Sequence, residues 1–104
     1  MEWKEMSTAV ANKEQFTGTN FKSVNILGFY FVYSYEQMIG FYVPNRGWYI
    51  NTGKYSATTS KHQKAAFYYI EQTRSLDKEE FDEFVDDKLI WMFAKSIDDR
   101  IEID

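Results

Sequence analysis

The feature that most constrains this chain is a change of hydrophobic period at residues 54–62. Before this stretch, apolar and aromatic residues alternate as they do in strands; after it, they recur every three or four residues, as in a helix. Thr58, Thr59 and Ser60 lie at the junction, where hydroxyl oxygens accept hydrogen bonds from the unpaired N–H groups of a helix N-terminus. Such a chain is expected to fold as an α+β domain.

The sheet is predicted over residues 20–51. Phe29–Tyr35 is dense in aromatic and β-branched residues, which is typical of a buried strand. Gly40 indicates a bulge or a point of close packing in the next strand, and Pro44–Gly47 has the composition of a hairpin turn. The pattern predicts a three- or four-stranded antiparallel β-meander with short links, over segments 21–26, 29–35, 38–43 and 48–51.

Two helices are predicted after the meander, packed on one face of it. The first covers residues 59–73, where the stripe is formed by Ala65, Ala66, Tyr69, Ile70 and Thr73. The second covers residues 77–95 and opens with Asp77 and Glu80 at the spacing of a capping box. Its helical stripe is Phe81, Phe84, Val85, Lys88, Leu89, Met92 and Phe93.

A chain of 104 residues is long enough for one core, so residues 1–104 are expected to form a single domain. Residues 1–16 form an N-terminal segment in which the spacing of Trp3, Met6 and Val10 indicates a short helix. Residues 96–104 are expected to be a charged tail. Three of its residues could form a last turn or strand: Ile97, Ile101 and Ile103.

Several kinds of site are excluded by residue usage. The chain has no cysteine and one histidine, so disulfides and thiolate metal sites are excluded and no zinc site is expected. Neither a glycine-rich phosphate loop nor a Ser-His-Asp arrangement stands out. We therefore expect a non-enzymatic protein without a cofactor or metal. No apolar run has membrane-spanning length and the N-terminus does not resemble a signal peptide, which predicts a cytoplasmic protein.

Charge is distributed unevenly along the chain. Residues 1–70 carry seven basic and four acidic side chains, whereas residues 71–104 carry five basic and twelve acidic ones. The acidic end either keeps an aromatic-rich protein in solution or imitates a nucleic-acid backbone and occupies a basic groove on a partner. On the second interpretation the partner-binding residues are Glu79, Glu80, Glu83, Asp86 and Asp87.

The basic residues near the period change also have two interpretations. The first is structural: the hydroxyl residues cap the helix, and the histidine is partly buried and hydrogen-bonded to a neighbour. The second is an anion site at the helix N-terminus, which becomes a nucleic-acid site if a groove with exposed aromatic residues leads away from it. The anion-site candidates are Lys54, Thr59, Ser60, Lys61, His62 and Lys64.

Three blocks of the chain resemble a family of small phage and prophage proteins. They are Tyr33–Ile39, Gly47–Ile50 and Lys54–His62, and the last follows the pattern Tyr-Ser-x-Thr-Thr-Ser-Lys-His from Tyr55. The resemblance covers residues 17–70 and leaves the acidic segment outside. The family has no assigned activity. The resemblance therefore implies a phage origin and, by analogy, a small protein that binds host machinery or host defence complexes such as CRISPR nucleases.

The leading functional hypothesis is a non-enzymatic phage protein that inhibits a defence nuclease of the anti-CRISPR kind. Its acidic face would bind a host protein or ribonucleoprotein with a basic groove, in the host cytoplasm. The alternative is a nucleic-acid-binding module that uses the basic helix N-terminus around Lys61. A third hypothesis is an accessory subunit that oligomerises through aromatic residues. The sequence leaves the oligomeric state open.

Overall fold

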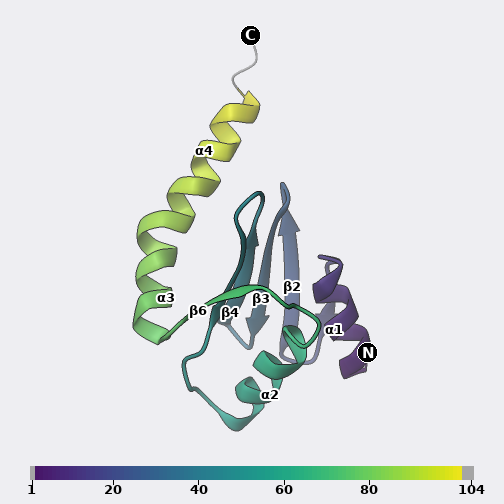
Figure 1. The fold of residues 1–104 in the computed structure, drawn as a ribbon. Coiled ribbons are helices and arrows are strands. Elements are labelled where there is room, and N and C mark those ends of the chain that lie inside the picture. Colours follow the sequence, from purple (N-terminus) through teal and green to yellow (C-terminus); the bar gives the residue numbers. More distant parts are fainter. Residues whose placement is uncertain (1, 102–104) are drawn as a thin grey trace.

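A computed structural model describes residues 2–101, with the side chains of residues 2–98. The fold is a six-stranded sheet with helices on both sides (Figure 1), which confirms the α+β class. In chain order the elements are α1 (Trp3–Ala11), β1 (Thr17–Gly18), β2 (Phe21–Ile26), β3 (Phe29–Ser34), β4 (Gln37–Val43), β5 (Gly47–Asn51), α2 (Ala57–Ala66), β6 (Thr73–Leu76), α3 (Lys78–Phe84), the π-helical segment η1 (Val85–Leu89) and α4 (Ile90–Ile101).

The sheet follows chain order from β1 to β6. Strands β1 to β5 are paired antiparallel in chain order. The meander therefore has five strands rather than the predicted three or four, with β1 added at one edge. Arg74–Leu76, which lie between the two predicted helices, belong to a sixth strand, β6, that pairs in parallel with β5. The chain leaves β5, passes through α2 and returns in the same direction, which is the crossover that a parallel pair requires.

The helices do not all pack on one face, so that part of the prediction is wrong. Along β3 the side chains alternate between two apolar clusters: Tyr30 and Val32 contribute to one, Phe29 and Phe31 to the other. A strand that is apolar on both faces has to be covered on both faces. Helices α1 and α2 cover the first cluster, and the continuous helical stretch α3–η1–α4 covers the second.

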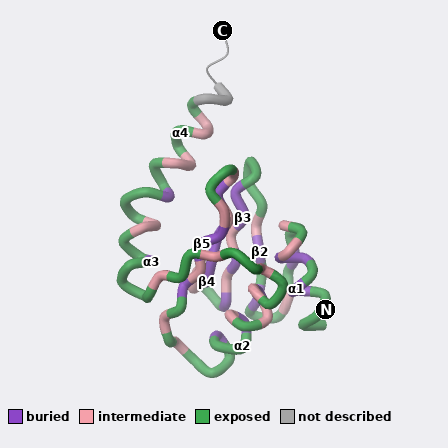
Figure 2. The backbone as a smooth tube through the Cα atoms, in the orientation of Figure 1, coloured by how far each residue is buried: buried purple, intermediate pink, exposed green. Residues whose placement is uncertain are grey.

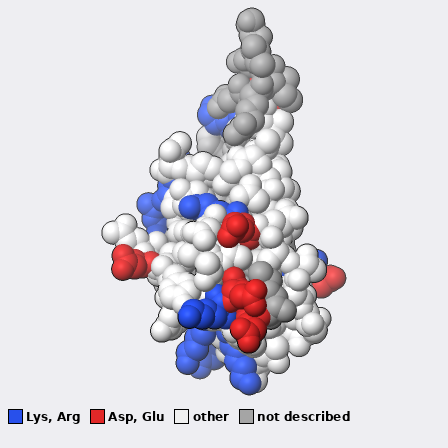
Figure 3. All heavy atoms as spheres, turned by 90° about the vertical axis from the view of Figure 1, so that its right-hand side faces the viewer, with Lys and Arg blue, Asp and Glu red and all other residues white. Residues whose placement is uncertain are grey.

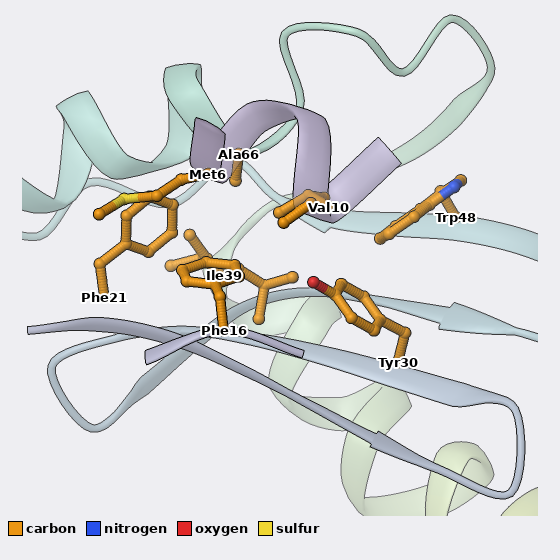
Figure 4. Close-up of a cluster of buried hydrophobic side chains, with 10 residues drawn as sticks. Met6, Val10, Phe16, Phe21, Tyr30, Ile39, Trp48 and Ala66 are labelled. Carbon is orange, nitrogen blue, oxygen red and sulfur yellow. The ribbon is translucent and has the colours of Figure 1, made fainter. Parts of the chain in front are cut away.

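The first cluster includes the residues labelled in Figure 4, which come from both helices, from the four strands β2 to β5 and from the residue before β1: Met6, Val10, Phe16, Phe21, Tyr30, Ile39, Trp48 and Ala66. The second cluster is built around Phe29, Phe41, Val43, Tyr49, Phe81 and Leu89. Figure 2 shows that buried residues concentrate in the central strands between the two helical layers, while α4 is mostly exposed or half-buried.

Gly40 has both properties that its position in a strand suggested. The register between β3 and β4 shifts between Val32 and Tyr33, where Ile39 is the extra residue of a bulge. An ideal Cβ on Gly40 would lie 2.2 Å from the Phe67 ring, so only glycine lets that ring reach the sheet. Phe67 is the C-cap of α2, the residue directly after the helix, and its packing fixes where the chain turns away from the helix.

Helix α2 is shorter than the predicted 59–73 and lies earlier in the chain. Its N-cap is Ser56, whose hydroxyl oxygen accepts a hydrogen bond from the Thr59 N–H at 3.1 Å. The predicted hydroxyl cap is therefore correct in kind but displaced by two residues. The helix ends at Ala66, so Tyr69 lies in a turn and is exposed, although the periodicity had placed it in the apolar stripe.

The acidic helix begins as predicted and continues further. Asp77 and Glu80 form a capping box, and the helical stretch runs through α4 to Ile101 rather than ending at residue 95. Most of the segment predicted as a tail, 96–104, is thus helical; Ile103 and its neighbours lie outside the described residues. Apolar residues recur every four positions at 81, 85, 89 and 93, a spacing that rotates by about 40° per repeat in an α-helix. The wider π-helical turn reduces that rotation.

Candidate functional site

A shallow groove of about 650 Å³ lies between α1 and α2, on the side of the sheet opposite the acidic helix. Three of its lining residues are lysines and three are aromatic. The lining residues are Trp3, Lys4, Ser7, Lys61, Lys64, Ala65, Tyr68 and Tyr69. They come from segments far apart in the sequence, so the groove exists only because the two helices pack together.

The floor of the groove is held by a hydrogen bond between the two helices. The Ser7 hydroxyl donates to the Ala65 carbonyl oxygen at 2.6 Å and also lies 3.0 Å from the Trp3 carbonyl oxygen. Ala65 is in the last turn of α2, where carbonyl groups lack partners within the helix. Ser7 is itself buried. The Ala65 carbonyl oxygen also accepts from the Tyr68 N–H at 3.5 Å. The shorter bond from Ser7 links α1 to α2 and fixes the distance between them.

Positive charge gathers along the groove. Lys4 in α1 and Lys61 and Lys64 in α2 are all exposed and line the same hollow. Figure 3 shows lysine and arginine atoms grouped at the lower end of this face, with acidic atoms above them. In α1 itself, Glu5 is engaged in capping the helix, where it accepts a hydrogen bond from the Glu2 N–H. The ammonium groups of the groove are thus free to meet an anionic ligand.

Exposed aromatic rings stand beside these lysines. Trp3 is 46% exposed, Tyr68 75% and Tyr69 44%. The two tyrosine rings pack edge to face at 5.0 Å, so each restrains the other. Flat apolar surfaces next to ammonium groups are the combination that binds ligands with both an anionic and an aromatic part. The groove is therefore chemically suited to nucleotides in a single strand.

Trp3 also borders a second hollow, of about 630 Å³, whose lining is more polar and includes His62. The Trp3 and His62 rings are 5.5 Å apart. His62 is only 4% exposed, stacks on Phe21 at 4.4 Å and is hydrogen-bonded through Nδ1 to Ser34 Oγ at 2.6 Å. Burial lowers the pKa of His62, so its neutral form is favoured. The partly buried, hydrogen-bonded histidine of the structural interpretation is confirmed.

The predicted anion site is only partly brought together. Lys61 and Lys64 line the groove, whereas Thr59 is buried and hydrogen-bonded to Ser34 and Ser56. Lys54 lies in the loop before α2, outside the groove, and Ser60 is exposed on α2 without lining it. The two lysines thus belong to a site on the flank of the helix, not at its N-terminus.

Six of the eight groove residues were not predicted as site residues: Trp3, Lys4, Ser7, Ala65, Tyr68 and Tyr69. Trp3 was assigned to the apolar stripe of the first helix, and Tyr69 to that of α2. Phe67 is the C-cap of α2, so Tyr68 and Tyr69, which follow it, lie outside the helix. The position of Phe67 is thus the signal that could have placed them. The contribution of Lys4 depends on the packing of α1 against α2, which periodicity does not reveal.

The predicted partner-binding carboxylates lie on α3 and η1. All five are exposed: Glu79, Glu80, Glu83, Asp86 and Asp87. Glu80 also has a structural role, since its carboxylate accepts a hydrogen bond from the Asp77 N–H at 3.0 Å. The other four are available to solvent, on the far side of the sheet from the groove.

Neither a metal site nor a membrane-spanning helix is found among the described residues. Residues 2–98 contain no group of three or more histidine or acidic side chains placed to hold a metal ion. Within the described part of the chain, every helix is too short or too polar to cross a membrane.

Comparison with known proteins gives one match. The family model described as "Family of unknown function (DUF8033)" matches residues 4–83, from α1 to the end of α3. No curated protein and no solved structure matches the chain. The matched region includes every groove residue except Trp3, and it excludes η1 and α4.

Proposed function

Because the chain belongs to the DUF8033 family of unknown function, we propose its function from the groove: it binds single-stranded nucleic acid between α1 and α2. The observation that carries the proposal is the presence of three lysines and three exposed aromatic rings in one hollow of about 650 Å³. The lysines would neutralise successive phosphates, and the rings would stack on bases. A duplex hides the faces of its bases, so a single strand is the better ligand.

The groove residues have separate roles in this proposal. Lys4, Lys61 and Lys64 contribute a salt-dependent part of the affinity, since each neutralised phosphate of a single strand gives a slope of about −0.7 in log K against log salt. Three such contacts give a slope of about −2. Trp3, Tyr68 and Tyr69 contribute stacking, worth about 1–3 kcal/mol per base and insensitive to the identity of the base.

The test is fluorescence anisotropy of labelled single-stranded DNA and RNA at several salt concentrations. We expect the wild type to bind with the slope given above, and the triple variant Lys4→Gln, Lys61→Gln, Lys64→Gln to lose most of the affinity. The matched control replaces three exposed lysines outside the groove, Lys54, Lys78 and Lys88, and is expected to bind like the wild type. Equal loss in both triple variants, or no binding by the wild type at low salt, would refute the proposal.

A second candidate function uses the acidic helix. It is favoured by the exposure of Glu79, Glu83, Asp86 and Asp87 along one helical stretch, away from the groove. The resemblance to phage proteins adds the idea that this face inhibits an RNA-guided defence nuclease of the host by occupying its nucleic-acid channel. Spaced carboxylates can replace phosphates in a basic channel, and the association would be fast and weakened by salt.

This second candidate is tested by adding the protein to a purified RNA-guided nuclease before its DNA target. Inhibition of cleavage should disappear when the four carboxylates are replaced by their amides, with Glu80 kept because it caps α3. Inhibition that survives the amide variant would contradict the mimicry, and so would absence of inhibition across the nuclease classes tried.

A further inference from the structure

The exposed side of α4 carries large apolar side chains. Ile90 is 61% exposed and Trp91 60%, while their neighbours Met92 and Phe93 pack on the second cluster of the sheet. Phe93 reaches Phe29 and Phe31, with ring centroids at 5.1 and 6.3 Å. The helix therefore has two apolar sides, one of which the sheet covers and the other of which faces solvent.

Helix α4 also extends past the ends of the strands, as Figure 1 shows. The last ring of α4 that packs on the sheet is Phe93, and the helix continues for two more turns to Ile101. A short helix without packing is marginally stable in water. An additional partner along this part of α4 would stabilise it.

A groove of about 340 Å³ lies beside the exposed indole, between α4 and the turns after β2 and β4. Its lining includes Pro44, Arg46, Trp91 and Lys95. The combination of an apolar wall and two cations suits an aromatic ring that arrives together with a carboxylate. Trp91 and Asp87 of a second chain have that chemistry.

We infer that this surface pairs with a second copy of the same chain through antiparallel α4 helices. Asp87 and Lys95 are both exposed and lie four residues on either side of Trp91. A two-fold axis near Trp91 therefore places Lys95 of each chain opposite Asp87 of the other, so one contact forms twice. A parallel arrangement would bring like charges together.

The interface is modest in area. Each fully buried aromatic residue contributes about 150–250 Å², and a stable interface needs about 1,200 Å² in total. Burying Ile90 and Trp91 alone falls short of that area. The dimer approaches it only if the partner chain also covers the groove beside them. We therefore expect a dimer that dissociates at micromolar concentration. The inference is independent of nucleic-acid binding, which uses the other face of the sheet.

The experiment is sedimentation velocity of the full chain over about 1 to 300 μM, a range that spans a micromolar dimer. The wild type should shift from monomer to dimer, and Trp91→Gln should weaken the dimer at least about tenfold, as for a central aromatic anchor. The control is Tyr68→Gln, which removes an equally prominent ring on the groove between α1 and α2 and should leave dimerisation unchanged.

A charge exchange decides between self-association and other occupants of this surface. Asp87→Lys and Lys95→Asp should each weaken the dimer, and the double variant should restore it, because the two charges face each other across the axis. A wild type that stays monomeric at all concentrations would leave α4 to a different partner and overturn the inference. Failure of the double variant to recover, or an equal effect of Tyr68→Gln, would also overturn it.

Discussion

Both faces of the sheet are packed with apolar side chains, and the α1–α2 face adds hydrogen bonds between buried polar groups. On the α1–α2 face, buried polar groups form directed hydrogen bonds: Ser34 joins Thr59 and His62, and Ser7 joins the end of α2. On the α3–α4 face, rings pack on rings, as between Phe41 and Phe81 at 5.4 Å. The hydrogen-bonded face carries the lysines and exposed rings of the groove, and the ring-packed face carries the carboxylates.

The difference indicates which face can hold the residues of a binding site in place before the ligand binds. A hydrogen bond fixes distance and direction, so the Ser7–Ala65 bond holds α1 and α2 at a set spacing before a ligand arrives. Apolar packing is non-directional and allows α4 to extend past the sheet. The π-helical turn compensates for the rotation of the apolar stripe around the helix. We therefore propose ligand binding for the first face and association with another protein chain for the second.

The largest expected effect comes from Phe81→Ala, which tests whether the two faces fold as one unit. Phe81 is buried in the second cluster, and truncation of a buried phenylalanine costs about 3–5 kcal/mol. Urea unfolding, followed both by circular dichroism and by tryptophan emission, should show coincident transitions at lower urea. Phe81→Leu is the control and should lose less. Separate transitions would mean that α3–α4 unfolds without the groove.

A smaller loss is expected from Gly40→Ala, which acts on the hydrogen-bonded face. The new methyl group collides with the Phe67 ring, and such overpacking costs about 1–3 kcal/mol. The displaced ring should also move Tyr68 and Tyr69, which follow it, and so weaken nucleic-acid binding. The control adds Phe67→Ala to Gly40→Ala, which removes the collision; the double variant should be less destabilised than the sum of the two single changes. Simple additivity would contradict the proposed contact.

The smallest effect concerns His62 and sharpens the contrast between polar and apolar packing. Burial lowers its pKa, so below the ordinary histidine pKa of about 6.5 the unfolded chain binds more protons than the folded one. The stability contributed by neutral His62 is complete above that pH and is lost as the pH falls toward the lower, folded pKa. Urea unfolding at pH values on either side should show a larger loss for the wild type than for His62→Gln. Equal losses would show that His62 does not titrate differently on folding.

Much of the fold was predictable because local patterns decide it. The four central strands, the capping box of Asp77 and the role of Gly40 follow from alternation, capping chemistry and glycine sterics. The cover on both faces was readable in principle from Phe29–Val32, where every residue is aromatic or β-branched. The parallel strand β6 and the end of α2 were not, because long-range pairing with β5 overrides a weak local helical pattern.

The candidate site was harder to predict than the fold. Lys61 and Lys64 were predicted as anion-site residues, but three of their neighbours in the groove come from α1, more than fifty residues earlier in the chain: Trp3, Lys4 and Ser7. Trp3 lies on a helix whose other large residues, Met6 and Val10, are buried. The exposed residue of an apolar stripe cannot be identified until the position of the helix relative to the rest of the fold is known.

The central claim is that the groove between α1 and α2 binds single-stranded nucleic acid, and the emission of Trp3 reports on it most directly. Replacing Trp91 by phenylalanine leaves Trp3 and the buried Trp48 as the only tryptophans, so changes in quenching arise mainly from Trp3. We predict saturable quenching on titration with a single-stranded oligonucleotide at low salt, and its loss in the triple variant Lys4→Gln, Lys61→Gln, Lys64→Gln. Unchanged emission at oligonucleotide concentrations that saturate binding would contradict the claim.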